Sequence, residues 1–292
     1  AAESSATCCH QDDKKPQEKM SLSHSLLALA VVSQASAFVA PSAASGRLGA
    51  YKPSCVTRLR GGAASVSMAD PKLSYFDARG VVEPTRLMLA FAGAKYEDFR
   101  YKVDMTPKPP AAVEFNADKE AGVLAVNMNR APMLEVDGGK IGQSHAIARY
   151  LARKHDMMGS NELEAAQIDT LYEHVRDIKD AWVKMRFNPA LDEAAKKEAM
   201  DKYLSDDLPE WCKKLEAAIG CFNGSGALSV GSKASLADVA IYAFLSGYYP
   251  ADKKAEVEAA YAACPRLSAI VKAVGGNAGV QEWEKVRPVT AM

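Results

Sequence analysis

Tyr75 and Arg79 are two side chains that could together stabilise an anion. The alternation in residues 72–76 is typical of a short strand with Tyr75 near its carboxyl end, where α/β sheets commonly bind ligands. A turn is expected at 77–80, and it would bring Arg79 back over the strand end. A phenol can donate a hydrogen bond to an anion, and a guanidinium adds positive potential. Taken alone, each residue also fits a plainer role, as a half-buried strand tyrosine and a solvated turn arginine.

A second candidate anion site lies at Gln143-Ser144, where a helix is expected to begin. The free backbone N–H groups and the positive dipole end of a helix N-terminus attract anions. Ser144 would also suit a simple helix cap, and the residues alone do not separate these alternatives. Ala131-Pro132 stands directly before a strand expected at 133–136.

The elements that would position these residues form a small α/β unit. A further strand is expected at 96–102, and Asp137-Gly138-Gly139 has the composition of a hairpin turn. One helix should follow the first strand, with Pro84 in its first turn and Gly93 as its stop. The apolar faces of the two helices are predicted to be Leu87, Met88 and Phe91, and Ile147, Tyr150 and Leu151.

From Asn161 onward the pattern becomes helical. A long helix ending before Pro189 is expected to bury one face, and a helical stretch at 192–220 should be interrupted near Pro209. The predicted buried face of the long helix is Leu163, Ile168, Leu171, Val175, Ile178 and Trp182. Ser235 and Asp238 have the spacing of a capping box before another helix, with shorter helices to Trp283. The sequence therefore predicts an α/β domain at 69–155 followed by an all-helical domain at 161–292.

These residues stand at matching spacings in a known family. From Pro71 to the end, the chain resembles the glutathione transferases, most closely the sigma type, through Tyr75, Arg79, Ala131-Pro132, Gln143-Ser144 and the Ser235/Asp238 box. The resemblance implies a thioredoxin-like N-terminal domain followed by an all-α C-terminal domain. It also implies that glutathione is the co-substrate.

The resemblance assigns Tyr75 as the donor to the glutathione sulfur and Arg79 as the arginine beside it. A free thiol has a pKa of about 8.5, and the thiolate is the nucleophile. Lowering that pKa by about two units requires about 2.7 kcal/mol of preferential stabilisation of the thiolate. One hydroxyl donor together with nearby positive charge is of the right size.

The resemblance also places the rest of the tripeptide. Gln143 and Ser144 would hold the γ-glutamyl carboxylate, and the backbone of Ala131 would pair with the cysteinyl part of glutathione. Pro132 is expected to be cis, and Arg130 occupies the position before this step, where the family often has Gln or Lys.

Two further features come from the long helix. Asp177 aligns with the carboxylate that reaches across a dimer to the neighbour's ligand, which implies a homodimer; a solvated helix acid is the alternative. The apolar second substrate is expected against Phe76, Trp182 and Val183, which would serve equally well as core residues. No metal is expected, since thiolate addition needs none.

The stretch 103–129 departs from the sigma pattern, because it is longer and lacks the tryptophan that contacts the glycine end of glutathione. Lys119 is a possible substitute. The function expected is conjugation of glutathione to hydrophobic electrophiles, and the same thiolate could reduce lipid hydroperoxides. The alternatives are a non-catalytic glutathione- or ligand-binding protein, as in the lens crystallins, and a glutathione-dependent isomerase.

The composition and charge of the chain argue against several other classes of protein. The chain has 292 residues and a formal net charge of +0, so it lacks the basic excess that binding to nucleic acid requires. Its six cysteines show no metal-ligand spacing and no disulfide framework. The apolar run at 25–32 is too short for a permanent membrane span.

The first 68 residues are expected to be a leader. Residues 1–19 are polar and patternless and are taken as upstream sequence, whereas 20–37 has the apolar run and the Ala35-Ser36-Ala37 cleavage site of a signal peptide. Residues 38–68 begin with Phe38, are rich in Ser and Ala and contain no acid. They resemble the transit part of the plastid address of algae with red-lineage secondary plastids. A plastid location is therefore expected, with the secretory pathway or the cytoplasm as alternatives.

Overall fold

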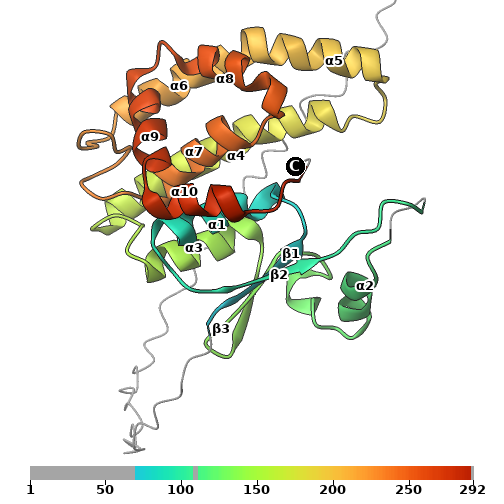
Figure 1. The fold of residues 1–292 in the computed structure, drawn as a ribbon. Coiled ribbons are helices and arrows are strands. Elements are labelled where there is room, and N and C mark those ends of the chain that lie inside the picture. Colours follow the sequence, from blue (N-terminus) through green and yellow to red (C-terminus); the bar gives the residue numbers. More distant parts are fainter. Residues whose placement is uncertain (1–69, 108–110, 291–292) are drawn as a thin grey trace, which may run out of the picture. The chain divides into compact units, whose positions relative to one another are not determined.

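A four-stranded mixed sheet forms the core of the N-terminal domain (Figure 1). The computed structural model describes residues 70–107 and 111–290, so the three expected leader segments lie outside the described residues. The strands are β1 (Lys72–Phe76), β2 (Glu97–Tyr101), β3 (Met133–Val136) and β4 (Gly139–Gly142). Their order is β2-β1-β3-β4, with β1 parallel to β2 and the other pairs antiparallel.

Helices α1 (Glu83–Phe91) and α3 (Ser144–Lys154) connect this sheet to the helical domain. Pro84 lies in the first turn of α1, as predicted, where its missing N–H costs nothing. Leu87, Met88, Ile147 and Leu151 are fully buried. A third helix, α2 (Val113–Glu120), lies in the stretch 103–129, away from the helical domain (Figure 1).

The long helix α4 (Glu162–Arg186) opens the helical domain. Five of the six residues predicted on its buried face are buried, but the prediction for Leu163 is wrong, since its side chain is 67% exposed. Five residues separate Leu163 from Ile168, which places it about 140° around the helix from that face. Asn161 caps the helix by accepting a hydrogen bond from the backbone N–H of Glu164 at 2.9 Å.

Besides α4, the helical domain has a central helix, α7 (Leu236–Gly247), and further helices. They are α5 (Glu193–Lys202), α6 (Leu208–Gly220), α8 (Lys254–Tyr261), α9 (Pro265–Gly275) and α10 (Ala278–Val286). A π-helical turn at Tyr203–Asp207 separates α5 from α6, which confirms the predicted interruption near Pro209. None of the helices in the described ranges has both the length and the apolar character that crossing a bilayer demands.

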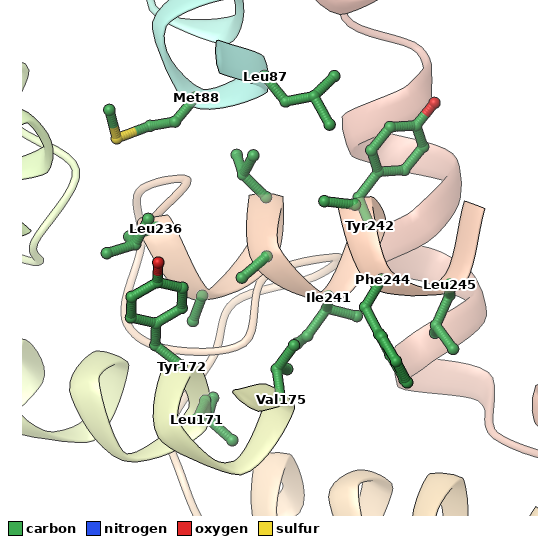
Figure 2. Packing of buried hydrophobic residues seen from close by; sticks show 14 of the residues in the cluster. Leu87, Met88, Leu171, Tyr172, Val175, Leu236, Ile241, Tyr242, Phe244 and Leu245 are labelled. Carbon is green, nitrogen blue, oxygen red and sulfur yellow. The ribbon is translucent and has the colours of Figure 1, made fainter. Parts of the chain in front are cut away.

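Helix α7 is buried on nearly every side, because α1 packs against one face and α4 against another (Figure 2). Its capping box is confirmed. The buried Asp238 carboxylate accepts hydrogen bonds from the backbone N–H of Ser229 at 2.7 Å and from the N–H and Oγ–H of Ser235, both at 2.8 Å. The box thereby fixes the start of the helix that holds the two domains together.

Candidate active site

Tyr75 lies on β1 with its ring half-buried and its hydroxyl against the turn that follows the strand. A Cβ at position 80 would lie 2.6 Å from Tyr75 Oη, and Gly80 has φ +47°, so both space and backbone require glycine there. Burial raises the pKa of Tyr75, although the backbone N–H of Val81 and the charge of Arg86 act in the opposite direction. The hydroxyl therefore keeps its proton at neutral pH and can donate it in a hydrogen bond.

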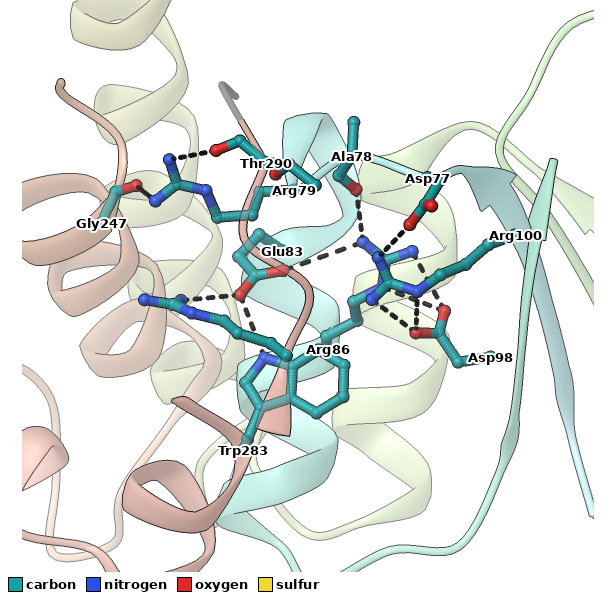
Figure 3. A network of polar contacts seen from close by, with 11 residues as sticks. Asp77, Ala78, Arg79, Glu83, Arg86, Asp98, Arg100, Gly247, Trp283 and Thr290 are labelled. Atoms are coloured by element: carbon teal, nitrogen blue, oxygen red, sulfur yellow. Dashed lines mark hydrogen bonds and ion pairs between the residues drawn. The ribbon is translucent and has the colours of Figure 1, made fainter. Parts of the chain in front are cut away.

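Arg79 lines the same cavity as Tyr75, but its guanidinium is anchored on the helical domain. Nη1 donates to the carbonyl oxygen of Gly247 at 2.5 Å, and Nη2 donates to that of Thr290 at 3.3 Å (Figure 3). Both of these acceptors are neutral, so they leave the positive charge uncancelled. Burial lowers the pKa of Arg79, and its Nε is buried without a hydrogen-bond partner among the described residues.

Two buried ionic groups hold the turn that carries Arg79 (Figure 3). Arg86 is fully buried; its Nη1 donates to the carbonyl of Ala78 at 2.6 Å and its Nε donates to Asp98 at 3.0 Å. Glu83 accepts from Trp283 Nε1 at 3.0 Å and from Arg287 Nη1 at 2.8 Å. The turn is thus fixed to β2 on one side and to α10 on the other. Sequence patterns did not indicate these partners, because these contacts join residues at least eight positions apart.

The segment expected to bind the cysteinyl part of glutathione contains the predicted cis bond between Ala131 and Pro132. Arg130 precedes it and is exposed, with its Nε 3.4 Å from the carbonyl oxygen of Asn127. The buried side chain of Asn127 holds this segment in place through hydrogen bonds. Its Nδ2 donates to the carbonyls of Arg130 at 3.0 Å and of Pro132 at 2.8 Å.

The N-terminus of α3 is free of side-chain caps. Gln143 occupies the cap position with φ +66°, and Ser144 is the first helical residue, so the interpretation of Ser144 as a capping serine is wrong. The N–H of Gln143 donates to Asn127 Oδ1 at 3.1 Å. The Gln143 side chain is exposed, and the first N–H groups of α3 remain available for an anion.

A cavity of about 250 Å³ lies between the turn after β1, helix α4 and helix α7. Tyr75, Arg79, Trp182 and Val183 line it, so four of the predicted site residues come together there. Trp182 is almost wholly buried, which shows that it is a core residue with one edge on the cavity. Phe76 does not line the cavity. Neighbouring strand residues point to opposite faces, and its ring packs 4.9 Å from that of Phe115.

His145 is a cavity residue that the sequence patterns did not single out. Its ring stacks on Tyr172 with centroids 4.3 Å apart, and its Nδ1 lies 3.2 Å from Glu173 Oε1. Burial lowers the pKa of His145, while the Glu173 carboxylate acts to raise it. In the sequence, only its position directly after Ser144 could have indicated that His145 lies near the site.

Asp177 lies on the exposed side of α4, with its side chain 63% exposed and 3.5 Å from Arg176 Nη2. Lys119 is exposed on α2 and does not line the cavity. In the described part of the chain, no three His, Cys, Asp or Glu side chains are grouped so that they could hold a metal ion.

The chain matches two family models along its length. The glutathione S-transferase N-terminal domain matches residues 71–153, and the glutathione S-transferase C-terminal domain matches residues 176–287. The probable glutathione S-transferase 5 of Caenorhabditis elegans is 31% identical over 229 residues, which cover 76% of this chain and 99% of that protein. The hematopoietic prostaglandin D synthase of Gallus gallus is 31% identical over 225 residues, which cover 77% and 100%.

Solved structures of related proteins are similar to this chain as well. The pi-class glutathione S-transferase of Onchocerca volvulus is similar with a TM-score of 0.59 at 27% identity, covering 75% of this chain and 93% of that one. The prostaglandin synthase D of Nilaparvata lugens gives 0.58 at 26% identity and covers 76% and 100%. The chain therefore belongs to the glutathione S-transferase family and is an enzyme of that class. The expected fold, a thioredoxin-like domain followed by an all-helical domain, is confirmed.

Proposed function

We propose that this protein conjugates the thiolate of glutathione to apolar electrophiles, with Tyr75 as the hydrogen-bond donor to the sulfur. The observation that carries the proposal is the position of the protonated Tyr75 hydroxyl on a cavity that also has apolar walls on α4 and α7. Glutathione would supply the sulfur, and the cavity would hold its reaction partner.

The tripeptide would bind along the edge formed by the Ala131-Pro132 segment and the start of α3. The backbone of Ala131 would pair with the cysteinyl residue, and the free N–H groups near Gln143 and Ser144 would bind the γ-glutamyl carboxylate. On binding, the thiol loses its proton to solvent. The Tyr75 O–H then donates to the sulfur anion, and the sulfur forms a bond to the electrophilic carbon while the leaving group departs with its electron pair.

Arg79 would raise the positive potential around the sulfur while its anchoring on Gly247 and Thr290 keeps the turn in place. Because these acceptors are uncharged carbonyls, they do not neutralise the guanidinium. Arg130 would contribute a further positive charge at the exposed end of the tripeptide site.

The test is the turnover of 1-chloro-2,4-dinitrobenzene with glutathione by the wild type and by Tyr75→Phe. Loss of one hydrogen bond to a charged sulfur predicts a fall in kcat/KM of roughly 10- to 100-fold with the fold preserved. Unchanged turnover would remove Tyr75 from this role.

A glutathione-dependent isomerase is the second candidate. It is supported by the similarity to two proteins named as prostaglandin D synthases, and the same thiolate would serve both reactions. Conversion of a cyclic endoperoxide with unchanged total glutathione would favour isomerisation over conjugation. Consumption of glutathione with lipid hydroperoxides would instead identify a peroxidase activity.

A homodimer in which Asp177 reaches the partner's glutathione is part of the proposal, supported by the exposure of that carboxylate on α4. Light scattering of the purified protein should give twice the mass of one chain, and Asp177→Asn should weaken glutathione binding. A plastid location remains a proposal that rests on residues 20–68; a fusion of this segment to a fluorescent protein in an alga with secondary plastids would test it.

A further inference from the structure

Positively charged side chains outnumber carboxylates around the cavity beside Tyr75. Four cationic residues of the described chain line it, namely Arg79, Arg176, Lys179 and Arg186. The only carboxylate that lines it within the described ranges is that of Glu83, which already bonds Trp283 and Arg287. The cavity therefore has an excess of positive charge that its own acids do not compensate.

Three of these cations lack a carboxylate in direct contact, and Arg79 is one of them, since it bonds the carbonyls of Gly247 and Thr290. Lys179 makes no hydrogen bond among the described residues, and the nearest carboxylate oxygen, from Asp180, is 4.0 Å from its Nζ. Arg186 has no ion pair or hydrogen bond there, and its guanidinium lies 5.5 Å from the centroid of the Phe187 ring. By contrast, Arg176 is paired with Glu173 at 2.5 Å.

Lys179 is also largely removed from water, because its side chain is only 16% exposed. An ammonium group buried without a hydrogen-bond acceptor is unfavourable, and burial lowers the pKa of Lys179 accordingly. A bound anion would supply the missing acceptor. The other cation, Arg186, lies seven residues further along α4, which is about 10 Å along the helix axis.

The rest of the lining is apolar. Val175 and Val183 from α4 and Phe244 and Tyr248 from α7 and its end contribute hydrophobic surface. A ligand that complements this cavity would combine an apolar body with one negative charge within reach of both Lys179 and Arg186. A neutral aromatic compound would use only the apolar part.

We propose that the second substrate is an apolar electrophile that carries a carboxylate, such as an enone derived from an unsaturated fatty acid, and that Lys179 and Arg186 bind this carboxylate. The inference rests on the proposed conjugating function. The glutathione sulfur forms a bond to the β-carbon of the enone, and the π electrons move to the carbonyl oxygen as an enolate. A proton from water then restores the ketone, which balances the proton that the thiol released.

The experiment compares ethacrynic acid, an enone with a carboxylate, with its methyl ester. The wild type should show at least a tenfold higher kcat/KM for the acid. Lys179→Met and Arg186→Met should each lower the acid-to-ester ratio of kcat/KM by about tenfold, mainly through the KM for the acid. Lys184→Met is the matched control, since Lys184 lies on the same helix, is exposed and does not line the cavity; it should leave the ratio unchanged.

Equal kcat/KM values for acid and ester in the wild type would overturn the inference. So would a rise in the KM for glutathione with an unchanged acid-to-ester ratio in Lys179→Met, because the cations would then serve the tripeptide. If neither electrophile nor 1-chloro-2,4-dinitrobenzene reacts, the proposed function fails, but binding still tests the charge preference. Calorimetry should then show octanoate bound at least tenfold more tightly than 1-octanol, and Lys179→Met should remove this difference; equal binding would contradict the inference.

Discussion

Asn127 Oδ1 accepts a hydrogen bond at 3.1 Å from the backbone N–H of Gln143, and this contact joins the two segments expected to bind glutathione. The Nδ2 group of the same side chain donates to the carbonyls of Arg130 and Pro132. Asn127 is 4% exposed, and a Cβ at Gly142 would lie 2.6 Å from its side chain, so the amide is closely enclosed. One buried amide thus sets the spacing between the cis-proline segment and the start of α3.

Asn127→Ala should therefore weaken glutathione binding more than electrophile binding. The substitution leaves two carbonyls and one N–H without a partner, and we expect the KM for glutathione to rise about tenfold while the KM for 1-chloro-2,4-dinitrobenzene changes less than about twofold. Asn116→Ala on the exposed face of α2 is the control and should change neither. Equal increases in both KM values would indicate a general loss of structure instead of a positioning role.

The capping box of α7 should matter more for stability than an ordinary helix cap. Asp238→Ala leaves the buried N–H groups of Ser229 and Ser235 without an acceptor, which should cost about 3 kcal/mol in the free energy of unfolding. Asp192→Ala removes an exposed cap from α5 and should cost only about 1 kcal/mol. Urea denaturation measures both values, and similar losses would show that the box acts as a simple cap.

Asp77 should make stability depend on acid pH. The hydrogen bond from Lys102 lowers the pKa of Asp77, burial acts against this, and Arg100 lowers the pKa further. Because the carboxyl pKa is depressed in the folded state, its contribution is present above the unfolded pKa of about 3.9 and is lost as the pH falls through the folded value.

The wild type should therefore lose more free energy of unfolding between about pH 5 and about pH 3 than Asp77→Asn does. Lys102→Met should also reduce this loss of free energy of unfolding, because it removes the strongest hydrogen-bond partner of Asp77. Parallel profiles for the wild type and both variants would exclude this contribution.

Local patterns predicted much of the fold. The strand that carries Tyr75, the hairpin after β3 and the Ser235/Asp238 box each depend on residues close in sequence, and the structure contains all three. The cis bond at Pro132 could be expected only through the family resemblance, since the residues alone do not distinguish the isomers.

The features that the sequence patterns did not predict depend on contacts between residues that are far apart in the chain. Nothing near Asn127 indicates that its amide bonds Gln143, sixteen residues away. The partners of Glu83, Trp283 on α10 and Arg287 directly after it, are likewise about two hundred residues away. Leu163 was misplaced although its spacing of five residues from Ile168 already puts it on a different side of the helix. Phe76 was misplaced although strand alternation already puts it on the face opposite Tyr75; its aromatic partner Phe115 lies on α2, in a stretch where no helix was predicted.

The ultraviolet absorbance of the thiolate, followed as a function of pH with glutathione bound, tests the central claim most directly. The wild type should titrate with an apparent thiol pKa about two units below the free value of about 8.5, and Tyr75→Phe should bring it back by about one unit or more. Tyr150→Phe, which removes a hydroxyl bonded to Asp137 outside the cavity, should leave the wild-type value unchanged. The same depressed thiol pKa in the wild type and in Tyr75→Phe would contradict the account.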